Sequence, residues 1–146
     1  MEEAFPGRVL LGIGTGHTEA AQECSQPLAT MGRLLDALAA AAVPVDRERM
    51  ELAALGPKML DLSAGRTLGA HPYCTPSAHT SFARERLGLG PLVAPGQPVV
   101  VSSGEQAVSA VQRHLKAGPD RMCVQAVGTT GVPQREWREL AAALIG

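Results

Sequence analysis

The sequence contains few aromatic residues and has no excess of either charge. Two Phe, one Tyr and one Trp supply few ring faces on which nucleic-acid bases could stack. Thirteen basic and fourteen acidic side chains give a formal net charge of -1, so the chain lacks the positive footprint that is typical of nucleic-acid-binding proteins. We therefore expect no nucleic-acid partner.

The sequence also lacks a disulfide framework, a signal peptide and a long apolar run. Cys24, Cys74 and Cys123 are odd in number and far apart, which is typical of reduced intracellular thiols. The acidic N-terminus lacks the basic and then apolar order of a signal peptide, and there is no run of 18 apolar residues. We expect a cytoplasmic protein without a membrane partner, folded as a single domain over residues 1–146.

Strand-like and helix-like segments alternate along the chain. We expect helices to begin near residues 27, 58, 75, 103 and 133, and strands at residues 8–14, 51–55, 68–73, 99–101 and 122–127. The Gly- and Pro-rich residues 88–98 are predicted to form a loop. Apolar strands that alternate with helices predict an α/β fold with a parallel sheet, in which ligands bind at the carboxyl ends of the strands.

Three glycines follow the first predicted strand in the stretch "RVLLGIGTGH". Gly12, Gly14 and Gly16 have the spacing G-x-G-x-G, whereas the Rossmann dinucleotide fingerprint is G-x-G-x-x-G running directly into a helix. The next helix is predicted to begin near Pro27, too far along the chain to point at a phosphate held by these glycines. The pattern favours a structural loop, and a Rossmann-type nucleotide-binding module is the third of our hypotheses.

The turn "LGPKM" at residues 55–59 joins a predicted strand to a predicted helix. Such a turn presents unpaired backbone N–H groups, and Lys58 adds a positive charge, so a phosphate could bind there. The G-x-x-x-x-G-K-[ST] pattern of Walker-type NTPases is absent. An ordinary turn with a solvated lysine remains the alternative interpretation.

The pattern assigns neither a metal site nor a catalytic residue. His71, Cys74 and His79, with His17 as a distant fourth ligand, match the spacing of no zinc motif, so we expect no metal. No G-x-S-x-G nucleophile elbow surrounds any of the serines, so a hydrolase triad is not indicated.

Several collinear stretches carry a resemblance that extends over nearly the whole chain: "RVLLGIGTGH", "MGRLLDALAAA", "LAALGPKMLDLSAGRTLGAHPY", "TPSAHTSFAR", "KAGPDRMCVQAVG" and "PQREWRELAAAL". Together they resemble the luciferase-like monooxygenase family, and within it the coenzyme F-420-dependent oxidoreductases of actinobacteria. The resemblance implies an oxidoreductase that binds coenzyme F-420 (a deazaflavin) or FMN. Such an enzyme acts on a small-molecule substrate by hydride transfer or oxygen chemistry.

The resemblance also implies a (β/α)8 TIM barrel with its cofactor at the carboxyl ends of the strands. It places cofactor-binding residues at three successive strand ends: Gly14, Thr15, Gly16, His17, Gly56, Pro57, Lys58, Met59 and His71. The four residues from Gly56 to Met59 would hold the phosphate of the cofactor, and Pro72 would accompany His71.

A full barrel takes about 250 residues, and the first strand of this chain resembles the fourth strand of the family. We therefore expect a truncated, partial barrel of about five βα units with parallel strands. Its open strand edges favour pairing with another chain, so we expect the chain to form a homo-oligomer, to aggregate or to fold as an open sheet. The alternative hypothesis is a non-catalytic, self-associating scaffold or remnant of that fold.

Overall fold

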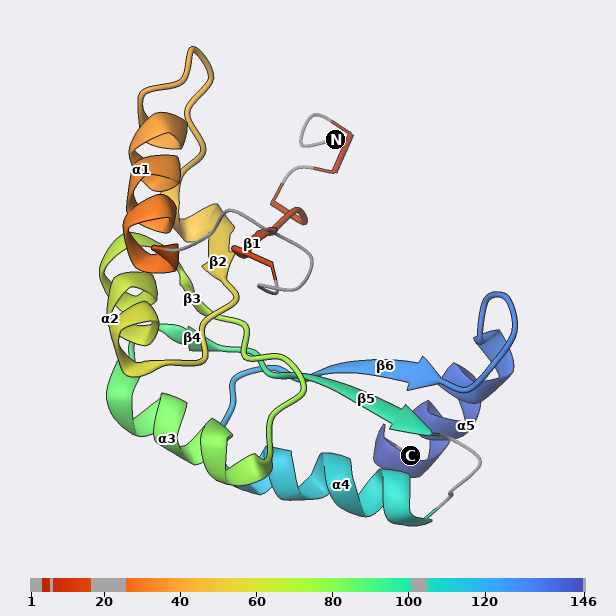
Figure 1. Cartoon of the computed structure of the whole chain (residues 1–146). Coiled ribbons are helices and arrows are strands. Elements are labelled where there is room, and N and C mark those ends of the chain that lie inside the picture. Colours follow the sequence, from red (N-terminus) through yellow and green to blue (C-terminus); the bar gives the residue numbers. More distant parts are fainter. Residues whose placement is uncertain (1–3, 6, 17–25, 101–104, 146) are drawn as a thin grey trace.

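The computed structural model describes residues 4–5, 7–16, 26–100 and 105–145. Over these residues the chain is a mixed α/β structure (Figure 1). Its helices are α1 (Pro27–Ala39), α2 (Pro57–Arg66), α3 (Ser77–Leu87), α4 (Glu105–Lys116) and α5 (Gln134–Ile145). Its strands are β1 (Leu11–Ile13), β2 (Met50–Leu52), β3 (Gly69–Ala70), β4 (Leu92–Val93), β5 (Gly96–Val100) and β6 (Cys123–Val127), and a 3-10 turn, η1 (Arg47–Arg49), precedes β2.

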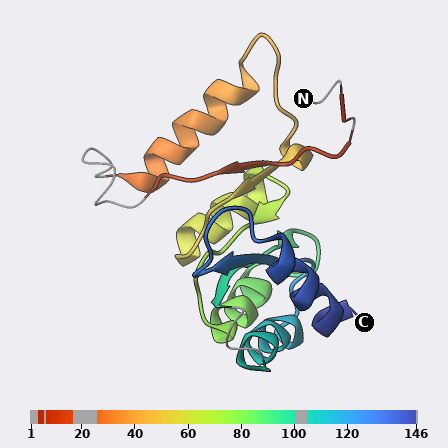
Figure 2. The same cartoon turned by 90° about the vertical axis from the view of Figure 1, so that its right-hand side faces the viewer.

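All paired strands run parallel, and within each sheet every strand lies beside its neighbour in sequence. One sheet has the order β1-β2-β3-β4 and the other pairs β5 with β6. Only Ala94 and Pro95 separate β4 from β5, and a parallel bridge between Tyr73 and Gly96 continues the pairing across this bend. Helices α1 to α4 follow one another around the outside of the strands, with α1 and β1 at one end of the molecule and α4 and α5 at the other (Figures 1 and 2).

The larger core lies between the first three helices and the four-stranded sheet. Met50 and Leu52 of β2 are buried in it together with Leu60 of α2, whereas Glu51 lies on the opposite face because successive strand residues alternate. We call this opposite face the inner face and define it by Glu51, His71, Tyr73, Cys123 and Gln125. A smaller core joins α4 and α5 to β5 and β6.

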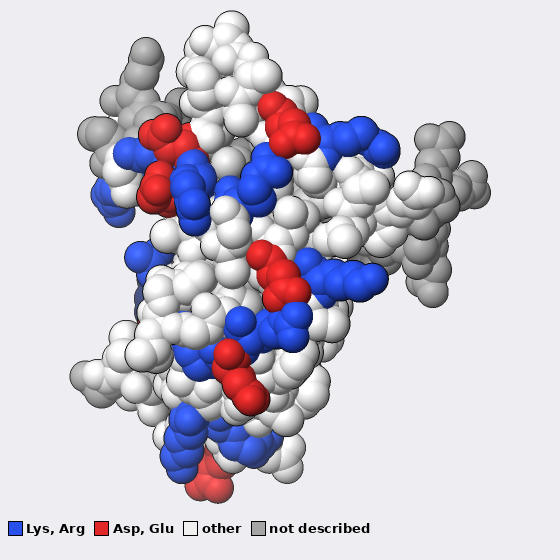
Figure 3. Space-filling view, turned by 90° about the vertical axis from the view of Figure 1, so that its left-hand side faces the viewer, with Lys and Arg blue, Asp and Glu red and all other residues white. Residues whose placement is uncertain are grey.

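Exposed ion pairs connect neighbouring helices on the outer surface. Arg66 of α2 contacts Asp36 of α1 at 2.6 Å, and Arg86 of α3 donates two hydrogen bonds of 2.6 Å to Asp61 of α2. Acidic and basic side chains consequently alternate across this face in the space-filling view (Figure 3). None of the helices within the described residues is both long and apolar enough to cross a membrane.

The structure corrects three sequence-based predictions. The strand expected at residues 8–14 is confined to Leu11–Ile13, and Leu11 is 41% exposed because β1 is an edge strand. Residues 88–98, predicted as a loop, contain β4 and the beginning of β5, since parallel neighbours supply their backbone partners. The third prediction is that Trp137 and Leu140 share one apolar face of the last helix, since they are three residues apart. Leu140 is buried, whereas Trp137 is 48% exposed.

Candidate functional site

A cavity of about 920 Å³ lies where β1, β2 and β3 end and α1 and α2 begin. Parallel strands bring their carboxyl ends to one edge of the sheet, so loops that are distant in sequence meet there. The lining residues come from these loops and from the first turns of the two helices: Gly14, Thr15, Gly16, Pro27, Leu28, Ala53, Leu55, Gly56, Pro57, Lys58, Met59, His71 and Tyr73.

The structure brings most of the predicted cofactor-binding residues together around this cavity. Those that line it are Gly14, Thr15, Gly16, Gly56, Pro57, Lys58, Met59 and His71. His17 lies outside the described residues. Pro72 is buried beneath the loop and is not one of the lining residues. Three strand ends that are up to about sixty residues apart in sequence therefore form one wall.

The first turn of α2 gives one side of the cavity a positive character. Gly56 caps the helix with extended backbone, and Pro57 occupies a first-turn position where its missing N–H costs no hydrogen bond. The amides of Met59 and Leu60 donate to the Gly56 carbonyl at 3.1 and 3.0 Å. The first turn contains no acidic side chain, and the exposed Lys58 adds a charge to the positive end of the helix.

The glycines of the loop after β1 allow its backbone to lie close to the loop after β2. A Cβ on Gly14 would lie 3.0 Å from the Cβ of Ala53, so a larger residue would push the two loops apart. Gly16 has φ +73°, in the left-handed region that favours glycine. The loop therefore needs these glycines for its own geometry, and it also exposes backbone to the cavity.

An acid–base pair lies on the inner face beside the cavity. His71 Nδ1 is 3.7 Å from Glu51 Oε1. Within the described residues, His71 Nδ1 and Glu51 Oε2 are both buried without a hydrogen-bond partner. Burial raises the pKa of Glu51, and the nearby charges of His71 and Arg121 oppose this rise without cancelling it. Glu51 therefore retains its proton to a higher pH than an ordinary glutamic acid.

Gly96 makes room for the imidazole of this pair. A Cβ on Gly96 would lie 2.8 Å from His71 Nε2 and 2.9 Å from the ring of Tyr73. Both side chains therefore pack directly over the backbone of β5. A side chain at position 96 would displace His71 from the cavity wall.

Two further contacts extend the polar inner face to β6. The Tyr73 hydroxyl donates to Gln125 Oε1 at 2.6 Å. Burial raises the pKa of the Cys123 thiol, and the negative charge of Glu51 raises it further. The sequence analysis missed Glu51, Tyr73 and Gln125, although a single acidic residue within the apolar stretch "MELAAL" was a usable signal for Glu51.

His79, one of the residues considered above as a zinc ligand, hydrogen-bonds to the protein backbone. His79 Nε2 is 2.8 Å from the Leu55 carbonyl, to which its N–H donates, and this bond ties α3 to the cavity loop. Among the described residues, a set that excludes His17, no three His, Cys, Asp or Glu side chains are grouped closely enough to hold a metal ion.

Comparison of this chain with family models, with curated protein sequences and with solved structures finds no match. The cavity and the residues that line it are therefore the observations that bear on function.

Proposed function

We propose that this chain is a partial (β/α) barrel of the luciferase-like type that binds coenzyme F-420 or FMN in the cavity. It acts as an oxidoreductase on a small-molecule substrate. The observation that carries this proposal is that the residues which the resemblance implies at the cofactor, though drawn from three strand ends, line one cavity of about 920 Å³. This volume lies within the roughly 300–1,000 Å³ of pockets that hold small organic ligands.

The topology favours a barrel over a Rossmann module. A Rossmann sheet reverses its strand order at the ligand crevice and carries helices on both faces. The paired strands here follow sequence order without reversal, and α1 to α4 lie on one side of them (Figure 1). In a barrel, the inner face with Glu51 and His71 would face the axis.

The residues around the cavity fit the parts of a flavin-type cofactor. The turn from Gly56 to Lys58 offers backbone amides and a cation to a phosphate, while Leu28, Leu55 and Met59 offer apolar surface to a ring system. A bound flavin or deazaflavin supplies the hydride or oxygen chemistry. His71 lines the cavity, where it can exchange a proton with a substrate, and Glu51 lies 3.7 Å from its Nδ1.

Cofactor titration tests this function. We expect purified protein to bind F-420 or FMN, and Lys58→Gln to weaken that binding about tenfold by removing one charge-assisted contact to phosphate. Lys116→Gln, which removes the same charge from α4 outside the cavity, leaves the affinity unchanged. If wild-type protein binds neither cofactor, measured by fluorescence and calorimetry, the proposal is wrong.

The open sheet edges favour a second candidate, a self-associating scaffold. Within the described residues, β1 pairs only with β2 and β6 pairs only with β5, so each leaves one row of backbone groups without a strand neighbour. On this reading light scattering finds a defined oligomer whether or not a cofactor binds. A monodisperse monomer at all accessible concentrations contradicts it.

A further inference from the structure

A second, smaller cavity of about 290 Å³ lies where α3 begins, against β5 and α4. It shares no lining residue with the cavity of the proposed function. The residues that line it come from the loop after β3, from β5 and from one side of α4: Cys74, Thr75, Pro76, Ser77, Gln97, Ala110, Arg113 and His114.

The loop after β3 leads into the N-terminus of α3, and both line this cavity. Cys74 has φ 54°, in the left-handed region, and its amide donates to the Gly96 carbonyl at 2.8 Å. Pro76 caps the helix with extended backbone, and the His79 amide donates to the Pro76 carbonyl at 2.9 Å. The amides of Ser77 and Ala78 thus lie at the positive end of an 11-residue helix whose first turn has no acidic residue.

Within the described residues, one buried oxygen atom on each of two side chains that line this cavity lacks a hydrogen-bond partner. Thr75 is only 9% exposed, and its hydroxyl has no hydrogen-bond partner within the described residues. Gln97 Oε1 is likewise buried without a partner. Because the oxygen and nitrogen of a glutamine amide exchange places when the group turns over, Gln97 can present either a donor or an acceptor. Buried polar groups in folded proteins normally have partners, so these two indicate a polar ligand.

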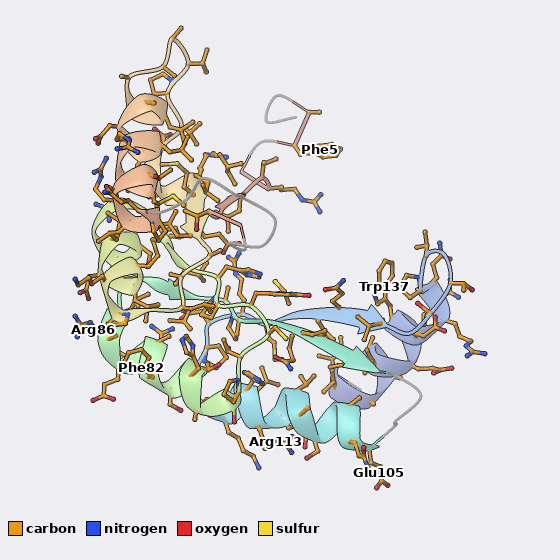
Figure 4. The ribbon with its side chains drawn as sticks, in the orientation of Figure 1. Phe5, Phe82, Arg86, Glu105, Arg113 and Trp137 are labelled. Atoms are coloured by element: carbon orange, nitrogen blue, oxygen red, sulfur yellow. The ribbon has the colours of Figure 1, made fainter. Side chains whose placement is uncertain are left out.

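The charged residue of the cavity is positive. Arg113 of α4 lines it and is exposed, with Nη1 donating to Ser109 Oγ at 2.9 Å (Figure 4). The lining contains neither Asp nor Glu. Arg113, Ser77 and Thr75 belong to the same lining, and guanidinium, backbone amide and hydroxyl groups are the donors that bind oxyanions.

His114 supports this wall and does not itself supply a charge. It is 3% exposed, its Nδ1 is 2.9 Å from Thr80 Oγ1, and it also hydrogen-bonds to the backbone of Thr75. Burial lowers the pKa of His114, and the charge of Arg113 lowers it further, so the ring is neutral near pH 7. The contacts of His114 hold the backbone of Thr75 in place just before the N-terminus of α3.

We propose that this cavity is a binding site for a phosphoryl group, either as inorganic phosphate or as a phosphate monoester. The Ser77 amide, the Thr75 hydroxyl and the Arg113 guanidinium supply the donors. Gln97, with its amide turned over, supplies another. The site does not depend on the proposed flavin-type cofactor, because the two cavities have separate walls.

The test is an amide-resolved NMR titration with two probes, inorganic phosphate and glycerol 3-phosphate, at constant ionic strength. We expect saturable shifts at the amides of Thr75, Ser77 and Ala78. Tighter binding of inorganic phosphate assigns the site to the free anion, and tighter binding of glycerol 3-phosphate assigns it to an ester.

Variants separate this site from general charge attraction and from the other cavity. Arg113→Gln is expected to weaken phosphate binding about tenfold. Lys116→Gln, on the same helix but outside the cavity, and Lys58→Gln, in the other cavity, leave it unchanged. Thr75→Val weakens binding and Thr75→Ser restores it, with dispersed spectra showing that each variant folds.

Two results overturn the proposal. One is the absence of saturable shifts at these amides with both probes. The other is equal weakening by Arg113→Gln and Lys116→Gln, which indicates diffuse attraction to the surface of α4.

Discussion

The two halves of the chain repeat the same strand and helix order but bury very different amounts of apolar surface. In the described residues of β1 to β4 and α1 to α3, ten buried apolar residues form one core, whereas β5, β6, α4 and α5 share only four. Leu52 and Leu60 in the first half are fully buried, while Leu140 is the buried residue of α5. Because apolar burial is the main stabilising contribution, the second half depends on its attachment to the first.

One cluster of the contacts that attach the second half surrounds Asp120, just before β6. Its carboxylate accepts a hydrogen bond from the Val93 amide at 2.7 Å and pairs with Arg84 of α3. The Asp120 amide donates back to the Val93 carbonyl at 2.9 Å, and Arg84 Nε donates to the Gly118 carbonyl at 2.9 Å. These polar contacts help to hold the less well packed half onto the better packed one, together with the Tyr73–Gln125 and Thr80–His114 hydrogen bonds.

The largest expected effect comes from truncating one buried leucine in each of the two cores. Leu60→Ala should lower the free energy of unfolding by about 4 kcal/mol, because Leu60 is fully enclosed and its site cannot collapse. Leu140→Ala should cost about 2 kcal/mol, because Leu140 is 6% exposed in a smaller cluster that can relax. Urea unfolding gives both values.

Amide hydrogen exchange measures which elements lose stability in each variant. Leu140→Ala should speed exchange in β6 and α5 and leave β2 and α2 protected, while Leu60→Ala should speed exchange throughout. Equal losses with the same exchange pattern would mean that the two halves form one cooperative unit of uniform stability.

The second effect concerns the close approach of the β3 and β4 backbones at Gly69. A Cβ on Gly69 would lie 2.0 Å from the Leu92 carbonyl oxygen, which belongs to the backbone of the neighbouring strand and cannot move aside. Gly69→Ala should therefore cost about 3 kcal/mol by forcing β3 and β4 apart. Thermal and urea unfolding measure this loss.

Gly65→Ala is the matched control, since a Cβ there would meet nothing within 4 Å in α2. It should stabilise the chain by about 0.5–1 kcal/mol, because alanine loses less backbone freedom in a helix than glycine does. A neutral Gly69→Ala would show that the strands separate readily at that point.

The sequence allowed much of this first half to be predicted because the signals for its elements are local. Pro27 and Gly56-Pro57 lie near the predicted beginnings of two helices, and the structure begins α1 at Pro27 and α2 at Pro57. The alternation of elements also predicted that strand ends meet at one edge of a parallel sheet. The cavity residues were assigned differently, because the local pattern favoured a structural loop at Gly14 to Gly16. Only the resemblance to the luciferase-like family placed that loop at one cofactor site with the turn from Gly56 to Met59, and both segments line one cavity.

The remaining features depend on contacts between residues far apart in sequence. The Tyr73–Gln125 hydrogen bond and the Glu51–His71 pair require the strand register, which periodicity does not determine. The strand β4 is two residues long and follows "GLGP", so local propensity favoured a loop, and pairing with β3 overrode it. No local signal in the sequence marks His114 as buried, and its packing against Thr80 buries it.

The smallest expected effect tests the attachment itself. Asp120→Asn keeps the shape of the side chain but removes the ion pair with Arg84, so it should cost about 1 kcal/mol, a value limited by the partial exposure of the carboxylate. The loss of stability should appear as faster amide hydrogen exchange in β6 and α5. Asp61→Asn, which removes an exposed ion pair between α2 and α3, is the control and should leave β6 and α5 unchanged.

The same contribution should depend on pH in a defined direction. Burial raises the pKa of Asp120, but the Val93 amide and the Arg84 guanidinium together outweigh it, so the pKa of the folded state lies below the ordinary value of 3.8. The stabilisation is therefore complete above that value and is lost as the pH falls through the pKa of the folded state. The difference in unfolding free energy between wild type and Asp120→Asn should be constant near neutral pH and shrink toward zero in acid. A difference that persists unchanged at about pH 2 would show that the carboxylate charge does not hold the two halves together.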